Sequence, residues 1–393
     1  MEISRRDKKN MADIEGFLKK REEEGGLRVL KPVSWRKNGK IRINNREYID
    51  FSSNDYLGLS SHPKLAEASK SAIDRFGTGA CASRLLSGDL ELIHSLEEKI
   101  ANFKNKESAL FFNSGYQANV GFFSSLYGKG DVIFFDALSH ASIIDGVTLS
   151  QAKFFRFQHN DVACLEGLLK KERAKFKSAL VITESIFSMD GDEAPLKGLV
   201  LLKEKYNCEI FVDEAHATGI FGQNGSGVVE KEGLGEKIDF IMGTFSKALA
   251  GFGAYLATSS KVSKYLINTC RSFIYSTALP PSVIACNLAA LDLVKEEPLR
   301  REKLLKIAEY FRNNLKNKGF EVKGESQIIP LITGENSKTV EFARKLQEKG
   351  YWVLPIRPPT VPLGEARLRF SLTFDHSEEI LQKLINEISR IRI

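Results

Sequence analysis

The sequence predicts an α/β protein with a large domain, in which helices sandwich a mostly parallel β-sheet, a smaller C-terminal α+β domain and an N-terminal segment. Short apolar runs alternate with helical patterns from about Asp50 to Ala278, and the alternation changes after Pro280-Pro281. With 393 residues, 42% of them hydrophobic, the chain can also bury a large core divided among two or three domains.

The expected elements follow in chain order. A helix and strand segment occupies residues 1–50. Five apolar runs then predict buried strands, each separated from the next by a plausible helix: 108–112, 131–135, 179–183, 208–212 and 239–242. After residue 280 the sequence predicts a long helix, strands near 320–322 and 328–332, and then helix, strand, strand and helix. We therefore expect a large domain at 51–280 and a small one at 281–393.

Charge and cysteine content are typical of a cytoplasmic enzyme. The net charge of +7 is spread through lysine-rich helical segments, which indicates a solvated surface more than a nucleic-acid site, although anionic substrates would benefit from the field. The five cysteines include no C-x-x-C pair, so we expect reduced thiols. Charges throughout residues 1–24 argue against a secretory signal, and no window approaches a transmembrane span. We therefore expect a cytoplasmic protein that binds neither nucleic acid nor a membrane.

Two side chains give the strongest functional signal. Lys247, in Gly243-Thr244-Phe245-Ser246-Lys247, and Asp213, in Phe211-Val212-Asp213, each follow an apolar strand. Both would lie at the carboxyl edge of the sheet, where open α/β sheets bind ligands. A lysine there can form a Schiff base with pyridoxal phosphate, while an acid near the pyridine nitrogen keeps the ring protonated and electron-withdrawing. A lysine in such a loop is usually a surface residue, but the pair together predicts a pyridoxal phosphate enzyme.

Further candidates lie where the same crevice would need them. Residues 113–119 follow a strand and open a helical pattern, so they form either a phosphate cradle or only a strand-to-helix turn. His140 follows another strand, and its ring either lies against an aromatic cofactor or serves as a structural hydrogen-bonding group. His216 either hydrogen-bonds a cofactor oxygen or begins a helix without a ligand. Ser188 lies in an acidic turn that lacks the full spacing of a calcium loop.

Motifs of three other protein classes are absent or lack the sequence context that they require. Asp213-Glu214-Ala215-His216 matches a helicase box, but the chain has no G-x-x-x-x-G-K-[ST] phosphate loop. Residues 77–82 satisfy G-x-G-x-x-A, yet they follow a helical pattern instead of a strand, which argues against dinucleotide binding. The six histidines form no H-E-x-x-H, so no metal site is expected.

Taken together, these motifs resemble those of the α-oxoamine synthases, pyridoxal phosphate enzymes of aminotransferase fold type I that condense an amino acid with an acyl thioester and release carbon dioxide. The resemblance runs from about Gly26 to the C-terminus and includes residues 51–59 and 83–88. Residues 276–281 and 357–362 look most like the member that joins L-alanine to a pimeloyl thioester in biotin biosynthesis. Glu214, Ala217 and residues 250–252 depart from the usual pattern, which bears on acyl selectivity more than on the chemistry.

The resemblance implies a role for each candidate residue. Lys247 would be the Schiff-base lysine, Asp213 the partner of the pyridine nitrogen and His140 the ring-stacking residue. The implied cofactor-binding residues are Ser114, Gly115, Tyr116, His140, Ser188, Asp213, His216, Thr244, Lys247, Ser276 and Thr277. Ser276 or Thr277 would reach the phosphate from a second subunit, which implies a homodimer with shared active sites. The implied substrate-binding residues are Arg28, Asn54, Thr360 and Arg369, with Arg369 as the anchor of the amino-acid carboxylate.

Two alternatives remain open from the sequence. Glycine C-acetyltransferase or another member of the family would use the same residues with different substrates. A catalytically silent relative would act as a binding or regulatory subunit, although it would have no chemical need for Lys247, Asp213 and His140 together. The acyl carrier is also open, because basic helices suit both coenzyme A and an acyl carrier protein.

Overall fold

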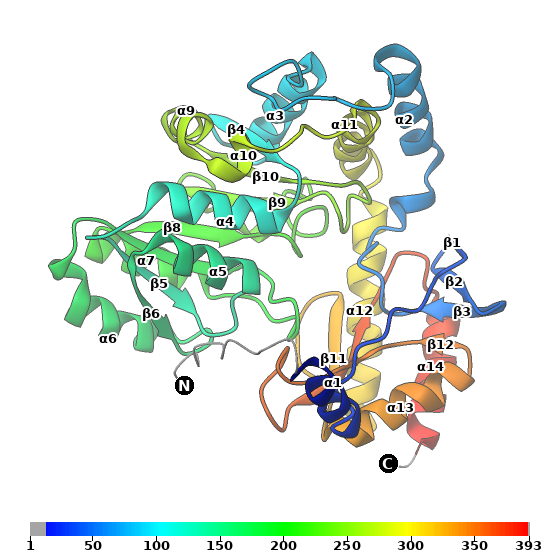
Figure 1. Ribbon diagram of the computed structural model, residues 1–393. Helices are drawn as coiled ribbons and strands as arrows, with labels where there is room; N and C mark the ends of the chain where they lie inside the picture. Colours follow the sequence, from blue (N-terminus) through cyan, green and yellow to red (C-terminus); the bar gives the residue numbers. More distant parts are fainter. Residues whose placement is uncertain (1–12, 392–393) are drawn as a thin grey trace.

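A seven-stranded sheet forms the centre of the larger part of the molecule (Figure 1). The computed structural model describes residues 13–391. Neighbouring strands follow the order β4 (Ser108–Phe112), β10 (Ala254–Thr258), β9 (Phe240–Thr244), β8 (Glu209–Asp213), β7 (Ala179–Glu184), β5 (Val132–Asp136) and β6 (Lys153–Phe157). Strand β10 runs antiparallel to both of its neighbours, and every pair from β9 to β6 is parallel. The predicted mostly parallel sheet is therefore confirmed.

Two hydrophobic cores, one on each face of this sheet, explain why its strands read as continuous apolar runs. Adjacent residues such as Phe134 and Phe135 of β5 are buried in opposite cores. One core is covered by α4 (Gly115–Leu126), α5 (Ala141–Ser150), α9 (Ser260–Thr269) and α10 (Arg271–Ile274). The other is covered by α2 (Pro63–Phe76), α3 (Glu91–Phe103), α6 (Val162–Glu172), α7 (Leu196–Tyr206), α8 (Val228–Lys231) and α11 (Pro281–Glu296). Because both faces are buried, polar side chains concentrate at the strand ends.

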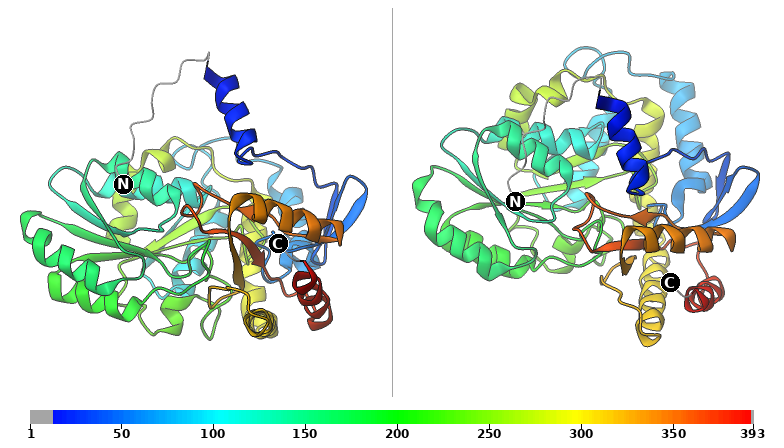
Figure 2. Two further views of the ribbon diagram at one scale, coloured as in Figure 1. Left: turned by 90° about the horizontal axis from the view of Figure 1, so that it is seen from below. Right: turned by 60° about the horizontal axis from the view of Figure 1, so that its bottom comes forward.

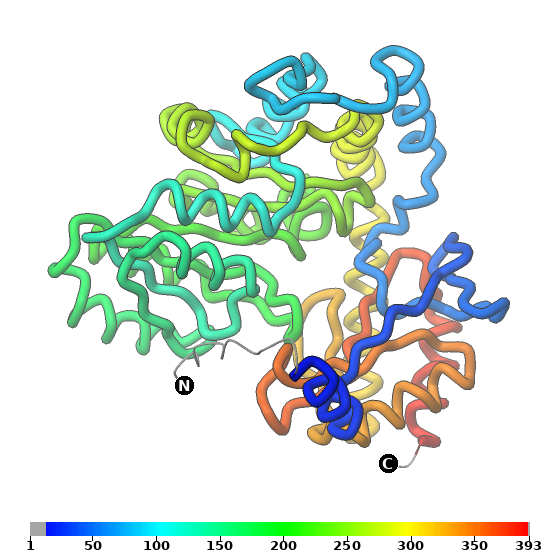
Figure 3. Tube along the Cα trace, in the orientation of Figure 1, coloured from blue at the N-terminus to red at the C-terminus, as the bar shows by residue number. Residues whose placement is uncertain are grey.

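Two smaller sheets complete the described chain. One has the order β11 (Ile328–Gly334), β14 (Ala366–Ser371) and β13 (Pro355–Ile356), and the other β1 (Trp35–Lys37), β2 (Lys40–Ile43), β3 (Arg46–Asp50) and β12 (Tyr351–Trp352). The accompanying helices are α1 (Ile14–Glu23), α12 (Leu299–Asn317), α13 (Asn336–Glu348) and α14 (Glu378–Arg390). Parallel pairing of β3 with β12 places the N-terminal strands beside the C-terminal part (Figure 2). The trace in Figure 3 shows α12, in yellow, leading into that part.

Individual elements differ from the sequence prediction. The strand expected near 320–322 is reduced to an isolated bridge between Val322 and Leu331. Strands β6 and β10 were not predicted: β6 is an edge strand with exposed Lys153 and Arg156, so it lacks a continuous apolar signal. Between β8 and β9 the helix is only the four-residue α8. The domain divisions at 50 and 280 stay a prediction. Within residues 13–391, no helix is both long and apolar enough to span a membrane.

Four neighbouring parallel strands end in polar residues at one edge of the large sheet. These residues are Asp136 of β5, Glu184 of β7, Asp213 of β8 and Thr244 of β9, and all four are buried. The register pairs Glu184 with Asp213, and Asp213 with Met242, so the ends are level with one another. This carboxyl edge is where open α/β sheets place their ligands, and it positions the site described next.

Candidate active site

A cavity of about 160 Å³ lies at this carboxyl edge of the sheet. Seven of the residues predicted to bind the cofactor line it: Gly115, Tyr116, His140, Asp213, His216, Thr244 and Lys247. Six further residues line it that the sequence analysis did not select: Asn119, Ser142, Glu184, Ala215, Met242 and Ser246. The fold thus gathers residues from five separate segments of the chain around one space.

Asp213 is held in place by hydrogen bonds from two elements. Its Oδ1 accepts a hydrogen bond from the Ala215 amide at 2.9 Å, and Asn119 Nδ2 of α4 lies 3.4 Å from its Oδ2. The same Asn119 amide donates to Ser142 Oγ at 2.9 Å, and Ser142 Oγ is 2.8 Å from His140 Nδ1. Asn119 Oδ1 is buried without a hydrogen-bond partner among residues 13–391. A continuous polar chain therefore connects Asp213 with His140.

His140 caps the N-terminus of α5, is exposed and lines the cavity. Its backbone amide donates to Glu184 Oε1 at 2.6 Å, which fixes the N-terminus of the helix. Partial burial lowers the pKa of His140, an effect opposed by Asp213 and reinforced by Lys247. The ring is therefore mostly neutral at pH 7 and available as a flat surface against an aromatic ligand.

Lys247 carries the only amine that lines the cavity among the described residues. Its Nζ has no hydrogen bond or ion pair with any residue of 13–391. Burial lowers its pKa to about 8, although Asp213 and Glu184 favour the charged form. A lysine with this pKa has a substantial neutral fraction near physiological pH, which a nucleophilic or basic amine requires.

Glu184 is an acidic group that the sequence analysis missed. Its side chain is buried, and burial, with a further contribution from Asp213, raises its pKa well above the ordinary value. The signal that would have found it is its position, one residue beyond the predicted strand 179–183 and at the same sheet edge as Asp213. The cavity thus contains one acid that favours its protonated form.

The N-terminus of α4 faces the cavity, because Gly115 and Tyr116 of its first turn line it. Ser114 precedes the helix, and its Oγ accepts a hydrogen bond from the Gln117 amide at 3.2 Å. Thr244, at the end of β9, also lines the cavity; its Oγ1 donates to the Gly253 carbonyl at 2.9 Å and lies 2.8 Å from Ser246 Oγ. Helix N-termini carry partial positive charge, so this end of the cavity suits a phosphate group.

His216 links the cavity to a buried arginine. Its Nδ1 lies 2.8 Å from the hydroxyl of Tyr56, which also donates to Asn54 Oδ1 at 3.0 Å. Burial places the pKa of His216 well below its usual range, with additional repulsion from Lys247 and Arg369. Arg369 Nη2 donates to the Tyr56 hydroxyl at 3.3 Å. The described chain thus places a neutral histidine, a phenol and a guanidinium in one network.

Arg369 is buried, and its hydrogen bonds go to neutral groups. Nε donates to the Ser188 carbonyl at 2.5 Å and Nη1 to Ser371 Oγ at 2.6 Å, while Asn54 Oδ1 lies 3.4 Å from Nη1 and Nη2. No carboxylate of residues 13–391 lies within ion-pair distance. A buried cation without an anionic partner is energetically unfavourable, so this guanidinium is suited to receive a ligand carboxylate.

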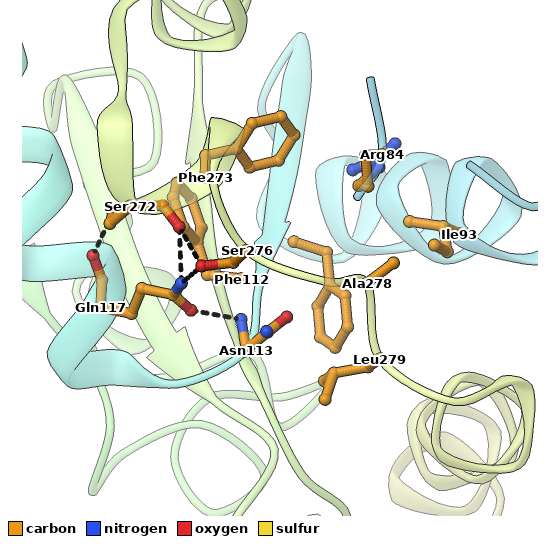
Figure 4. A pocket seen from close by; sticks show the side chains of 11 residues that line it. Arg84, Ile93, Phe112, Asn113, Gln117, Ser272, Phe273, Ser276, Ala278 and Leu279 are labelled. Carbon is orange, nitrogen blue, oxygen red and sulfur yellow. Dashed lines mark hydrogen bonds between the residues drawn. The ribbon is translucent and has the colours of Figure 1, made fainter. Parts of the chain in front are cut away.

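Other predicted residues lie outside the cavity lining. Arg28 Nη2 donates to Thr360 Oγ1 at 3.1 Å, in an exposed pair distant in sequence but adjacent in the fold. Ser188 contributes its backbone carbonyl to Arg369, as described above. Ser276 Oγ accepts from Gln117 Nε2 at 2.5 Å beside a hollow of only about 10 Å³ (Figure 4), and Thr277 is exposed next to it. In the single chain, Ser276 and Thr277 therefore do not reach the cavity.

Pyridoxal phosphate fits the groups that line this cavity. They comprise an unpaired amine at Lys247, a buried carboxylate at Asp213, a flat imidazole at His140 and a helix N-terminus at Gly115. These match the aldehyde, pyridine nitrogen, aromatic ring and phosphate of that cofactor. The fold and the site together define a pyridoxal phosphate-dependent transferase of fold type I.

Comparisons with known proteins support this assignment to the pyridoxal phosphate-dependent transferases. The sequence model described as "Aminotransferase class I and II" matches residues 46–388. A Geobacter sulfurreducens protein named 8-amino-7-oxononanoate synthase is 47% identical over 96% of this chain and 97% of its own length. The structure of Sphingomonas wittichii serine palmitoyltransferase has a TM-score of 0.92 and 33% identity, covering 97% of this chain and 98% of that one. For 8-amino-7-oxononanoate synthase of Francisella tularensis the TM-score is 0.76 and the identity 31%, covering 87% of this chain and 97% of that one.

The chain belongs to the class I and II aminotransferase family. Its similarity to named synthases and acyltransferases over nearly the whole chain confirms the resemblance to the α-oxoamine synthases. The protein is a pyridoxal phosphate-dependent acyltransferase.

Proposed function

We propose that the enzyme condenses L-alanine with a pimeloyl thioester to give 8-amino-7-oxononanoate, carbon dioxide and free thiol, a step of biotin synthesis. A bond forms between the alanine Cα and the acyl carbonyl carbon, the carbon–sulfur bond breaks, and the alanine carboxylate leaves as carbon dioxide. Relatives at 44–47% identity over more than nine-tenths of the chain carry the corresponding name, which supports this substrate pair. The structural observation that carries the proposal is Arg369, a buried guanidinium with no anionic partner in the described chain and with a hydrogen-bonded connection to the cavity.

Lys247 would attach the cofactor and then act as the base that takes the alanine Cα proton. When bound, pyridoxal phosphate supplies an electron sink for the charge that develops at Cα. The lowered pKa of Lys247, about 8, leaves a neutral amine to accept the proton at physiological pH. Asp213 would hold a proton on the pyridine nitrogen, and His140 would stack on the ring. The proton returned to Cα after carbon dioxide leaves would come from Lys247 or His140.

The remaining cofactor contacts divide between its two ends. Ser114, Gly115, Tyr116 and Thr244 would hold the phosphate at the N-terminus of α4. His216 and Ser188 would contact the phenolic edge. His216 is suited to this because its pKa lies well below the usual range, so its neutral ring can accept or donate a single hydrogen bond.

Substrate recognition would depend on Arg369 for the alanine carboxylate, with Asn54 beside it. A planar fork with two N–H groups directed at one carboxylate favours bidentate recognition of a small amino acid. Arg28 and Thr360, which are hydrogen-bonded to each other at 3.1 Å, would contact the acyl substrate from the exposed side.

We also propose that the enzyme is a homodimer in which Ser276 and Thr277 reach the phosphate site of the partner subunit. The segment around Thr277 forms a bridge with Ser83, and the nearby side chains of Leu85, Leu86 and Tyr275 are 53%, 78% and 73% exposed. Large apolar side chains clustered at a surface favour burial against another chain. Five unpaired cysteines in the described chain agree with a reducing, cytoplasmic compartment.

The test is thiol release by the cofactor-loaded protein with matched substrate pairs. L-alanine with pimeloyl-CoA is compared with glycine and acetyl-CoA, with L-serine and palmitoyl-CoA, and with L-alanine and a pimeloyl acyl carrier protein. Release that is at least about tenfold faster with either alanine pair supports the proposal. Faster release with glycine and acetyl-CoA would assign the glycine C-acetyltransferase reaction. Faster release with L-serine and palmitoyl-CoA would assign the serine palmitoyltransferase reaction. No release with any pair would favour a binding or regulatory role.

A further inference from the structure

His159 joins two carboxylates that lie on different segments, and the proposed reaction does not use it. Its Nδ1 is 2.9 Å from Asp136 Oδ1 at the end of β5, and its Nε2 is 2.7 Å from Asp192 Oδ2 in the turn between β7 and α7. Asn160 Nδ2 also donates to Asp192 Oδ2 at 3.0 Å. Both ring nitrogens therefore face a carboxylate oxygen, an arrangement that requires both to carry a proton.

The charge of this histidine follows from its partners. Burial alone would lower the pKa of His159, but hydrogen bonds and attraction from Asp136 and Asp192 outweigh that effect and raise it to about 10. Asp136 is fully buried and Asp192 is partly buried, so water screens the interaction only in part. At pH 7 the ring is an imidazolium between two anions.

Asp192 belongs to a turn, residues 187–193, that is fixed on the sheet side by His159. The Phe187 amide donates to the Asp192 carbonyl at 3.1 Å, and the Phe187 ring meets the His159 ring edge-on, with centroids 4.4 Å apart. Gly191 has a φ of +66° and a Cβ there would meet the Ile328 carbonyl oxygen at 2.3 Å, so the turn also packs closely against β11. The turn is therefore held between the two parts of the molecule.

The other side of this turn contacts the two arginines of β14. Arg369 Nε donates to the Ser188 carbonyl at 2.5 Å, and Arg367 Nη1 donates to Asp190 Oδ1 at 2.7 Å. Arg367 is completely buried, which leaves little freedom for the turn to shift without changing these contacts. A continuous set of contacts thus leads from His159 through Asp192 and the turn to Arg369.

We propose that His159 is a positioning residue that orients Arg369 for the amino-acid carboxylate by fixing the 187–193 turn through Asp192. This inference rests on the proposed function, in which Arg369 binds the carboxylate of L-alanine. His159 itself does not line the Lys247 cavity. Its loss would displace the Ser188 carbonyl and tilt the guanidinium fork, which weakens recognition of the amino acid more than that of the thioester.

The main test compares steady-state kinetics of three variants of the full-length, cofactor-loaded enzyme. His159→Gln and Asp192→Asn keep the size of each side chain but remove the ionic contact. His94→Gln is the matched control, because His94 pairs with Asp89 at 2.7 Å on the surface, outside the site. We expect the KM for L-alanine to rise about tenfold in the first two variants, with the KM for pimeloyl-CoA and kcat within about threefold of wild type. His94→Gln should match wild type.

Two outcomes overturn the inference. One is a KM for L-alanine that stays within twofold of wild type in Asp192→Asn, the variant that also decides the matter if His159→Gln does not fold. The other is an equal rise in the KM of both substrates, which indicates general disruption. If wild type shows no turnover, the proposed function has failed, and the inference is then judged from the Kd of L-alanine, measured by the change in cofactor absorbance. A Kd raised about tenfold in both variants supports it, and an unchanged Kd refutes it.

A second measurement is independent of the reaction. Imidazole ¹H–¹⁵N NMR of the full-length protein at pH 7.5, with His159→Gln to assign the signals, reports the protonation of both ring nitrogens. Two protonated nitrogens support the bridging imidazolium, and a neutral ring contradicts it.

Discussion

Replacing Lys247 with methionine is expected to stabilise the cofactor-free protein while abolishing its activity. In the folded protein the pKa of Lys247 is about 8, against 10.5 for an ordinary lysine. Each unit of difference between the folded and unfolded pKa values corresponds to ~1.4 kcal/mol. The charged form of Lys247 therefore destabilises the folded state by up to about 3 kcal/mol at pH 7. Methionine has a similar length and removes this charge.

The sign and pH range follow from the same pKa values. Between pH 8 and 10.5 the unfolded chain binds more protons at Lys247 than the folded one, so wild type gains stability as the pH rises through this range. The destabilisation is complete below pH 8 and is lost above 10.5. The advantage of Lys247→Met should therefore be about 3 kcal/mol at pH 7 and about 2 kcal/mol at pH 9.

Urea unfolding of the cofactor-free proteins at both pH values measures this difference. Lys153→Met is the control, since Lys153 is exposed on β6, and its stability should stay within about 0.5 kcal/mol of wild type at both pH values. Packing by the new methionine adds a contribution that does not depend on pH, so the decrease between pH 7 and 9 is the decisive quantity. An advantage that is constant with pH, or a variant less stable than wild type at pH 7, would refute the reasoning.

Three further predictions concern the site and its support. Asp213→Asn should retain the cofactor, because the amide fills the same space, but lower the rate of thiol release at least ~100-fold; a normal rate would contradict its role. Lys104→Met should lower the free energy of unfolding by ~3–5 kcal/mol, because Glu214, 2.7 Å away, would stay buried and unpaired. Urea unfolding should show that the double variant Lys104→Met/Glu214→Leu recovers most of that lost stability. A double variant as unstable as Lys104→Met alone would contradict the explanation by an unpaired Glu214. Arg369→Lys should raise the KM for L-alanine about tenfold because the planar fork is lost; an unchanged KM would show that the carboxylate binds elsewhere.

The sequence allowed the prediction of five strands of the large sheet that are buried on both faces, although β10, which is also buried on both faces, was missed. Strands β5, β7, β8 and β9 are apolar throughout their middle, so their positions, and hence those of Asp213 and Lys247, followed from the pattern. Strand β6 was not predicted because Lys153 and Arg156, which are exposed at the sheet edge, interrupt its apolar pattern. The antiparallel β10 returns between β4 and β9, a pairing that no local pattern reveals.

Contacts between segments that are distant in the sequence could not be predicted from local sequence patterns. The hydrogen bond between Tyr56 and His216 and the one between Arg369 and the Ser188 carbonyl each join residues more than 150 positions apart. Glu184 was missed because the predicted strand stopped one residue short of it. His159 carried no motif at all, and only the fold brings Asp136 and Asp192 to its two nitrogens. Residue types at strand ends could thus be predicted, whereas the network that orients them required the structure.

The central claim is that the Lys247 cavity joins L-alanine to a pimeloyl thioester with loss of the alanine carboxylate. The most direct measurement follows the carbons of L-alanine labelled with ¹³C at its carboxyl group, in a reaction with pimeloyl-CoA monitored by mass spectrometry. We expect labelled carbon dioxide, thiol and an unlabelled amino ketone in equal amounts, and none of them with Lys247→Met. Thiol release without labelled carbon dioxide would mean simple thioester hydrolysis, and a product that retains the label would exclude decarboxylation. Either result would contradict the proposed condensation.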